Sequence, residues 1–252
     1  MKAHLIQKDL PAARMAVLDP EDKMRHEITA SLRAHQQLIY QFAKAWYDSP
    51  YTFQSTKVFG HTACKIPFDL WILHDLFCQY RFDVVVECGT AGGGTTLWYA
   101  KLMDMLAIQG GRVFSIDNAE VDGRPEHSRI TYLTGSSTDP ELSAMVAPSL
   151  RDKSVLVNLD SNHLALHVLD ELALWAPLVP LGSWLVVEDT NGSPIVTDPD
   201  TGKRVSVEGP LAAVMEYLAK HPGEWFRDVV CERYWLTMNP HGWLQRVGEY
   251  TE

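Results

Sequence analysis

Apolar residues recur at helical spacing in the first part of the chain. Between residues 20 and 47 the spacing is roughly helical, which predicts helix, and the apolar set is Ile28, Leu32, Leu38, Ile39 and Phe42. Residues 48–67 are punctuated by proline and glycine and predict a loop. A second amphipathic helix is predicted at residues 68–80, with Asp69 near its start.

From Asp83 onward the pattern changes to short β-branched runs that alternate with helical segments. The predicted strands are residues 83–88, 111–117, 129–135, 154–160 and 182–189. Helices are predicted between them, most clearly at residues 97–107 and 164–179. Strands separated by helices of this length indicate an α/β fold with a parallel sheet that is covered on both faces.

The C-terminal part differs again. A helix is predicted at residues 209–221, and residues 224–240 predict two strands joined near Cys231. Residues 191–207 are rich in Gly, Pro and Asp and predict a mobile loop. Since no repeat or linker divides the chain, we expect one domain over residues 1–252, with a helical extension (1–80) before the α/β core (81–252).

Composition narrows the class of protein. The net charge of −10 argues against a nucleic-acid binder, because phosphate contacts need a basic surface. The four cysteines are scattered without C-x-x-C spacing, which is typical of reduced thiols. No apolar run has the length of a signal peptide or a membrane span. We therefore expect a cytoplasmic protein with a small-molecule partner.

The first predicted strand ends in Glu87 and is followed by a glycine-rich loop, residues 89–95. Ligands of open α/β sheets bind beyond the carboxyl ends of the strands, where glycines let the backbone approach them. The spacing departs from G-x-G-x-x-G, and the loop lacks the lysine of a P-loop. An acidic residue before the first glycine is typical of S-adenosylmethionine (SAM) sites, where Glu87 would face the ligand's ammonium group. The alternative is a tight turn without a ligand.

Two further strand ends fit an adenosine group. Asp117 ends the second strand and can accept both ribose hydroxyls, although an aspartate there is also a common cap. Ser136 and Ser137 follow the third strand and suit an adenine edge, or else cap the helix that opens at Asp139.

Three carboxyl groups end the fourth and fifth strands: Asp160, Glu188 and Asp189. Neighbouring strands would bring them together, and uncompensated they would repel one another. A hard divalent cation relieves this repulsion, so we expect Mg²⁺ or Mn²⁺ here. The alternative is a helix cap at Asp160 and a surface Glu-Asp pair.

His163 follows Asp160 by three residues. If a helix starts directly after the strand, His163 lies in its first turn beside the metal, where it could act as general base. A zinc site on His163 and His167 is a weaker alternative, because the glutamate of H-E-x-x-H is missing.

Several segments resemble the cephalosporin-hydroxylase-like family, which also contains rhamnosyl O-methyltransferases. They are "FGHTACKIPFDLWILHDLF", "VVECGTAGGGTTLWYA", "LDSNHLALHVLDELALWAPLVPLGSWLVVEDTNG" and "LTMNPHGWLQR". The resemblance implies a Rossmann-like class I methyltransferase fold, with a seven-stranded, mostly parallel sheet whose last strand is antiparallel. It also implies that Lys65 and Asp69 border the cleft. Asn162 departs from the acidic residue expected at its position.

The resemblance and the strand ends together predict a SAM- and metal-dependent O-methyltransferase that acts on a hydroxyl of a sugar or natural product, as a homo-oligomer. The expected catalytic residues are His163 and Asp160, and the expected metal ligands are Asp160, Glu188 and Asp189. The expected SAM-binding residues are Lys65, Glu87, Gly89, Thr90, Gly93, Thr95, Asp117, Ser136, Ser137 and Asp160. An NAD-dependent oxidoreductase and a metal-dependent hydroxylase or hydrolase remain as alternatives.

Overall fold

A computed structural model of the chain describes residues 20–197 and 202–249. Its centre is a seven-stranded sheet in the order β10-β11-β7-β6-β3-β4-β5. The strands are β3 (Val84–Cys88), β4 (Arg112–Asp117), β5 (Ile130–Thr134), β6 (Val155–Leu159), β7 (Trp184–Val187), β10 (Trp225–Arg227) and β11 (Trp243–Arg246). The first five run parallel, whereas β11 is antiparallel to both of its neighbours. The predicted seven-stranded sheet with an antiparallel last strand is therefore confirmed.

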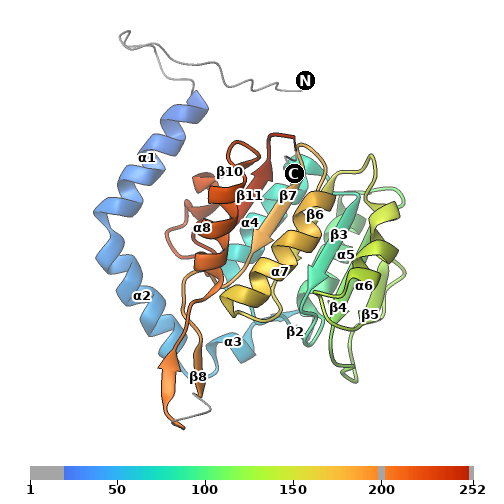
Figure 1. Cartoon of the computed structure of the whole chain (residues 1–252), viewed down its shortest axis with the longest axis horizontal. Helices are drawn as coiled ribbons and strands as arrows, with labels where there is room; N and C mark the ends of the chain where they lie inside the picture. Colours follow the sequence, from blue (N-terminus) through green and yellow to red (C-terminus); the bar gives the residue numbers. More distant parts are fainter. Residues whose placement is uncertain (1–19, 198–201, 250–252) are drawn as a thin grey trace.

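Helices cover both faces of this sheet. One face packs against α4 (Pro67–Tyr80) and α5 (Gly94–Met105). The other packs against α6 (Pro140–Val146), α7 (Ala165–Trp175) and α8 (Pro210–Lys220), and Figure 1 shows α7 and α8 in front of the strands. Every residue of β3 and β6 is buried, which is the pattern of central strands in a parallel sheet with two covered faces.

The N-terminal extension is helical but interrupted. The helix predicted over residues 20–47 is two helices, α1 (Pro20–Ala34) and α2 (Gln36–Asp48), because His35 leaves helical geometry with φ −112° and ψ 12°. The side chain of Arg25 on α1 lies 3.5 Å from Asp228 and stacks over the ring of Phe226. These contacts join α1 to the edge of the sheet beside β10.

The segment after α8 was predicted wrongly in part. Residues 224–240 hold only one strand, β10, followed by the short helix η3 (Val229–Glu232), and the second strand is β11. The Asp228 carboxylate accepts the Val230 backbone N–H at 3.0 Å, and this capping bond favours a turn over continued strand. Residues predicted as a mobile loop contain the paired strands β8 (Ile195–Thr197) and β9 (Arg204–Ser206).

The predicted loop at residues 48–67 also contains short elements. They are α3 (Thr52–Ser55), β1 (Lys57–Val58) and β2 (His61–Thr62), and β1 pairs with β2. This hairpin lies directly against the glycine-rich loop, since a Cβ at Gly94 would stand 2.5 Å from the Thr62 carbonyl oxygen. Single turns η1 (Ala147–Ser149) and η2 (Ala176–Leu178) follow α6 and α7.

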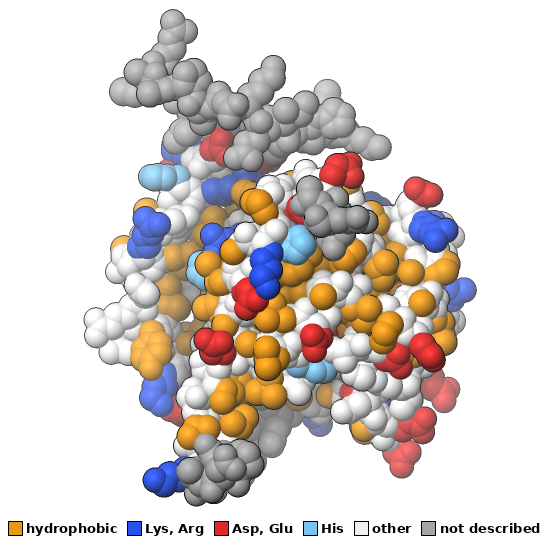
Figure 2. Space-filling model, viewed as in Figure 1, with side chains coloured by type: hydrophobic (Ala, Val, Ile, Leu, Met, Phe, Trp, Pro, Cys, Tyr) orange, Lys and Arg blue, Asp and Glu red, His pale blue; other side chains and the backbone are white. Residues whose placement is uncertain are grey.

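Charged side chains are interspersed with apolar ones on the surface. The face shown in Figure 2 carries scattered acidic and basic side chains between apolar ones, with no continuous basic stripe on that face among the described residues. No described helix combines the length and the apolar character that crossing a membrane requires.

Gly89 fixes how the loops after β3 and β6 meet. It has φ +98°, and a Cβ there would lie 1.9 Å from the Asp160 carbonyl oxygen. The Asp160 backbone N–H donates to the Cys88 carbonyl at 2.8 Å, so both loops are held against each other. Only a residue without a side chain allows this approach.

We therefore expect Gly89→Ala to destabilise the fold by about 3 kcal/mol or more, from strained backbone and overpacking together. Gly192→Ala is the matched control, because a Cβ there meets no atom within 4 Å. Urea denaturation measures both. A Gly89→Ala variant as stable as the control would show that the two loops can separate without cost.

Candidate active site

Three predicted side chains converge where β6 and β7 end. His163 Nε2 lies 3.4 Å from Asp160 Oδ1, and His163 Nδ1 lies 3.2 Å from Asp189 Oδ2. One possible ligand atom from each of these residues lies within 4.8 Å of the others, as a metal ion would require. His163 precedes α7, which begins at Ala165, so its predicted place in the first helical turn is wrong. We refer to Asp160, His163 and Asp189 as the acidic triad.

Glu188 does not join the triad. Its carboxylate is buried and accepts a hydrogen bond from the Lys65 ammonium group at 2.5 Å, and the same ammonium group also donates to Asp160. Glu188 as a metal ligand stays a prediction, and the structure gives this side chain a different partner. Lys65, predicted to border a cleft, is buried beside these carboxyl groups, with 4% of its surface exposed.

The charges of this cluster determine its pKa values. Burial opposes the charged form of Lys65, but Asp160 and Glu188 outweigh it and raise the pKa of Lys65 well above its ordinary value. Burial likewise opposes the charged form of Asp160, but Lys65 and His163 lower the pKa of this carboxyl group. Burial raises the pKa of Glu188. Asp160 is thus the group that most readily stays a carboxylate.

His163 responds to the same carboxyl groups. Burial would lower the pKa of His163, whereas the hydrogen bond to Asp160 and the charge of Asp189 raise it. About a third of the side chain (36%) is exposed, so the imidazole is reachable from outside. His167 lies outside the triad and contacts the Ser137 and Ser161 hydroxyls at 3.2 and 3.1 Å. The zinc alternative on His163 and His167 therefore finds no support in the geometry.

The glycine-rich loop and the end of β4 lie side by side. Asp117 accepts the backbone N–H of Ala91 at 2.9 Å and that of Ala119 at 3.0 Å, and its carboxylate lies 3.1 Å from Arg124. Gly93 is the N-cap of α5, with φ +74° and no side-chain cap, so the first turn of that helix keeps its N–H groups available. This arrangement places Asp117, the predicted ribose-binding residue, next to the glycine-rich loop.

Glu87 differs from its predicted orientation. Only 1% of its surface is exposed, and it accepts hydroxyl hydrogen bonds from Thr96 at 2.5 Å and Ser115 at 2.6 Å. Glu87 is therefore bound by hydroxyl groups of α5 and β4, and its carboxylate is not accessible to a ligand in this structure. Thr90 contacts the Ser115 hydroxyl at 2.7 Å, and Thr95 donates to the Ala63 carbonyl at 3.1 Å.

The two serines predicted to bind adenine differ in burial and in their hydrogen-bond partners. Ser136 contacts Thr138 at 2.8 Å and is exposed, whereas Ser137 is buried in a network with Ser161 and His167. Glu171 completes this network by accepting the Ser161 hydroxyl at 2.6 Å. Sequence reasoning missed Glu171, although a glutamate among the apolar positions of the buried face of α7 is a detectable signal.

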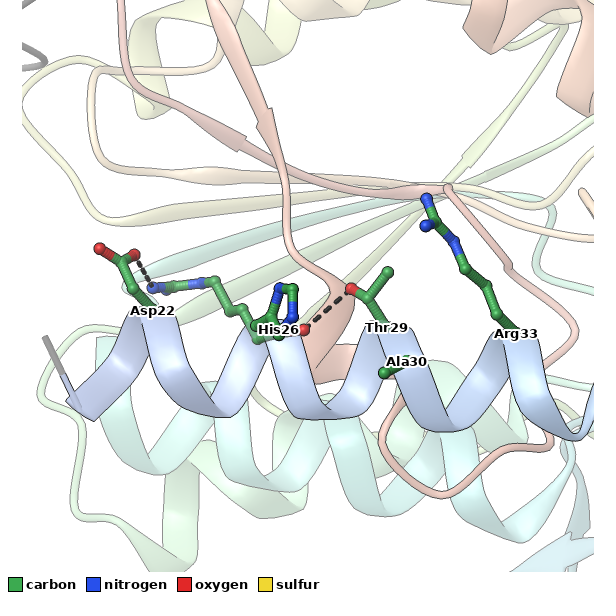
Figure 3. Close-up of a pocket in the computed structure, with 6 residues that line it drawn as sticks. Asp22, His26, Thr29, Ala30 and Arg33 are labelled. Carbon is green, nitrogen blue, oxygen red and sulfur yellow. Dashed lines mark hydrogen bonds and ion pairs between the residues drawn. The ribbon is translucent and has the colours of Figure 1, made fainter. Parts of the chain in front are cut away.

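Two surface pockets among the described residues lie elsewhere. One lies along α1, and Figure 3 shows Asp22, His26, Thr29 and Arg33 projecting from that helix. The other lies between the β1–β2 hairpin and the helices behind the sheet, and its aromatic lining includes Phe59, Trp71 and Trp98. Neither pocket contains a residue of the acidic triad.

Comparison with known proteins decides the family. The rhamnosyl O-methyltransferase/CmcI family matches residues 51–247 of the chain. The chain belongs to this family. This agrees with the motifs around the glycine-rich loop and the two acidic strand ends, and it confirms the predicted family and the prediction of a SAM-dependent O-methyltransferase.

Individual relatives agree with this assignment. The rhamnosyl O-methyltransferase of Mycobacterium tuberculosis (strain ATCC 25618 / H37Rv) is 29% identical over 209 residues, covering 80% of this chain and 82% of that protein. That of Mycobacterium leprae (strain TN) is 28% identical over 208 residues, covering 80% of this chain and 87% of that protein.

Solved structures confirm the class I methyltransferase fold. A structure of CmcI with Mg and SAM has a TM-score of 0.56 at 18% identity, covering 81% of this chain and 84% of that one. An apo structure of CmcI has a TM-score of 0.53 at 18% identity, covering 77% and 76%. At this identity the likeness concerns the fold alone.

The buried Glu87 of this methyltransferase predicts a pH effect on stability. Burial raises the pKa of Glu87 to about 7, and the hydroxyl bonds from Ser115 and Thr96 only partly oppose this. A carboxyl group with a raised pKa binds its proton more tightly in the folded state. Its contribution to stability is therefore complete below its ordinary pKa and is lost as the pH rises toward about 7.

We expect Glu87→Gln, which keeps an oxygen for both hydroxyl bonds, to gain stability relative to the native chain as the pH rises from 5 to 8. The expected difference is on the order of 2–3 kcal/mol. Urea denaturation at several pH values measures it, with the exposed Glu216→Gln as control. Parallel stability curves for Glu87→Gln and the native chain would contradict the buried, protonated glutamate.

Proposed function

We propose that this chain transfers the methyl group of SAM to a hydroxyl of a sugar or of a sugar-bearing natural product, with a divalent cation. The observation that carries the proposal is the acidic triad beside the glycine-rich loop, with Gly89 in contact with the Asp160 backbone. The family and its rhamnosyl O-methyltransferase relatives support the substrate class. The CmcI structure with Mg and SAM supports the two ligands.

The donor atoms fit a hard divalent cation. Asp160 and Asp189 offer carboxylate oxygens, which Mg²⁺ and Mn²⁺ prefer, and their side chains remain 23% and 29% exposed. These two residues would hold the cation, with Glu188 as the third, buried carboxyl group beside them. Glu188 would first have to exchange its bond from Lys65.

The glycine-rich loop and Asp117 fit SAM. Gly89 and Gly93 have φ values of +98° and +74°. Neither residue has a side chain, so a ligand can approach the backbone of the loop closely at both positions. Asp117 lies at the end of β4, next to Ala91, where a carboxylate can accept ribose hydroxyls. When bound, SAM supplies the methyl group and the cation polarises the acceptor hydroxyl.

The chain's own residues then prepare the acceptor. His163 accepts the hydroxyl proton on a ring nitrogen, because its imidazole is partly exposed and lies between the carboxylates of Asp160 and Asp189. Asp160 and Asp189 stabilise the resulting imidazolium. Lys65 fixes the side chain of Asp160, and the close contact of Gly89 with the Asp160 backbone holds the glycine-rich loop next to the acidic triad, which would keep the two ligands near each other.

Ligand binding tests the proposal first. We expect calorimetric titration to show micromolar SAM affinity and no NAD binding, measured with Mg²⁺ and again with EDTA. Turnover on rhamnoside acceptors should require the cation. Asp160→Ala should abolish turnover, and His163→Ala should lower kcat roughly 10²-fold with SAM affinity unchanged.

The exposed Asp170→Ala on α7 is the control and should behave as the native chain. Binding of NAD without SAM would overturn the methyltransferase function. Full activity in EDTA, or in Asp160→Ala, would overturn the metal site while leaving the methyl transfer intact.

We also infer that the chain self-associates through α2 and acts in the cytoplasm. Several large apolar side chains of this helix are exposed, namely Leu38, Tyr40, Phe42 and Tyr47. A helix that buries so little in one copy gains stability by packing against another surface. Sedimentation of the native chain as a dimer or larger, and of Phe42→Ser as a smaller species, is expected. A monomeric native chain would contradict this inference.

A further inference from the structure

Asp189 has an unusual backbone conformation for a residue of the acidic triad. Its φ is +53°, in the left-handed region that residues with a side chain seldom adopt. Such a conformation persists only where the surroundings hold it. The direction of the Asp189 carboxylate, and hence the geometry of the triad, depends on this backbone.

The amide of Asn239 holds this conformation. Its Oδ1 accepts the Asp189 backbone N–H at 3.0 Å, across 50 positions of sequence. Asn239 is 1% exposed, so no solvent replaces this acceptor if the side chain is lost. The backbone N–H of Asn239 donates to the Thr237 hydroxyl at 3.0 Å, and its carbonyl accepts the Gly242 N–H at 2.9 Å. The acceptor oxygen therefore stands on a fixed backbone.

The surrounding segment, Leu236–Gly242, binds the chain on both sides of Asp189. Before Asp189, the Val187 N–H donates to the Gly242 carbonyl at 2.9 Å. After it, the Thr190 hydroxyl donates to the Pro240 carbonyl at 2.6 Å, and the Asn191 N–H donates to the Met238 carbonyl at 3.1 Å. These bonds leave little freedom for the residues that flank the strained position.

A buried carboxyl group from the opposite side of the site holds the segment itself. Asp69, in the first turn of α4, accepts the Met238 N–H at 2.9 Å and is 1% exposed. Asp69 therefore joins the helix that follows Lys65 to the segment that holds Asp189. Buried hydrogen bonds therefore link the start of α4, next to Lys65, with the backbone of Asp189.

We propose that Asn239 is a positioning residue, which holds Asp189 in its left-handed conformation so that the acidic triad is formed before a cation binds. This inference rests on the proposed function, because it takes Asp189 to be a metal ligand. Asn239 acts through Asp189 and touches neither the cation nor the acceptor. The "TMNP" sequence around Asn239 would thus serve to hold the backbone of Asp189.

Binding of Mn²⁺ to the full, metal-free chain tests the proposal. We expect Asn239→Ala to weaken Mn²⁺ affinity at least 10-fold in calorimetry and to speed hydrogen exchange at the Asp189 amide. SAM affinity in EDTA should stay within about 2-fold, since the glycine-rich loop is untouched. Asn239→Asp keeps an oxygen that can accept the same N–H, and it should keep Asp189 exchange slow. The control is Ser193→Ala, at an exposed residue of the same loop.

The outcomes separate the two proposals. Native Mn²⁺ affinity and slow Asp189 exchange in Asn239→Ala would overturn the positioning role. If the native chain itself binds no Mn²⁺, the proposed metal site fails, and exchange at Asp189 still decides whether Asn239 holds that backbone. If Asn239→Ala does not fold, Asn239→Ser replaces it. The serine side chain is too short to reach the Asp189 N–H, so weaker Mn²⁺ binding and faster exchange at Asp189 are again expected.

Discussion

The ammonium group of Lys65 lies between the carboxyl groups of Asp160 and Glu188, in a place that water hardly reaches. Parallel strands that end side by side bring acidic side chains together, and in a buried setting their charges would oppose folding. The ammonium group of Lys65 offsets the negative charge of two of these groups, Asp160 and Glu188. Because Lys65 lies two residues before Pro67, the first residue of α4, this pairing also fixes where that helix begins against the sheet.

The same layer connects parts of the chain that are far apart in sequence. Ile66, Leu236 and Met238 form a small buried apolar cluster, and Ala43 and Trp46 of α2 pack against it. The residues next to them, Lys65 and Asn239, are the polar ones that contact the acidic site. Apolar burial thus stabilises the backbone from which these polar groups reach the strand ends. The N-terminal extension is for this reason part of the structure behind the site.

The sequence predicted what local patterns and parallel topology determine. The alternation of strands and helices predicted the sheet, and residues directly after strands, such as Asp160 and Asp189, converge because parallel strands end at one edge. Partners at long range were not predictable in this way. Glu188 binds Lys65 across 123 positions, and Glu87 binds the hydroxyl of Ser115 on the neighbouring strand. Both carboxyl groups look like ligand residues until their buried partners are known.

Burial divides the carboxyl groups of the site into two sets. Glu87 and Glu188 are almost completely buried and are bound by hydroxyl or ammonium groups of the chain, whereas Asp160 and Asp189 keep a quarter or so of their side chains exposed. The second set and His163 are the side chains of this site that remain accessible from solution. The buried set pairs with hydroxyl and ammonium groups of the chain itself. Within one sheet edge, solvent access therefore separates the acidic side chains that are open to a ligand from those that are bound by the chain.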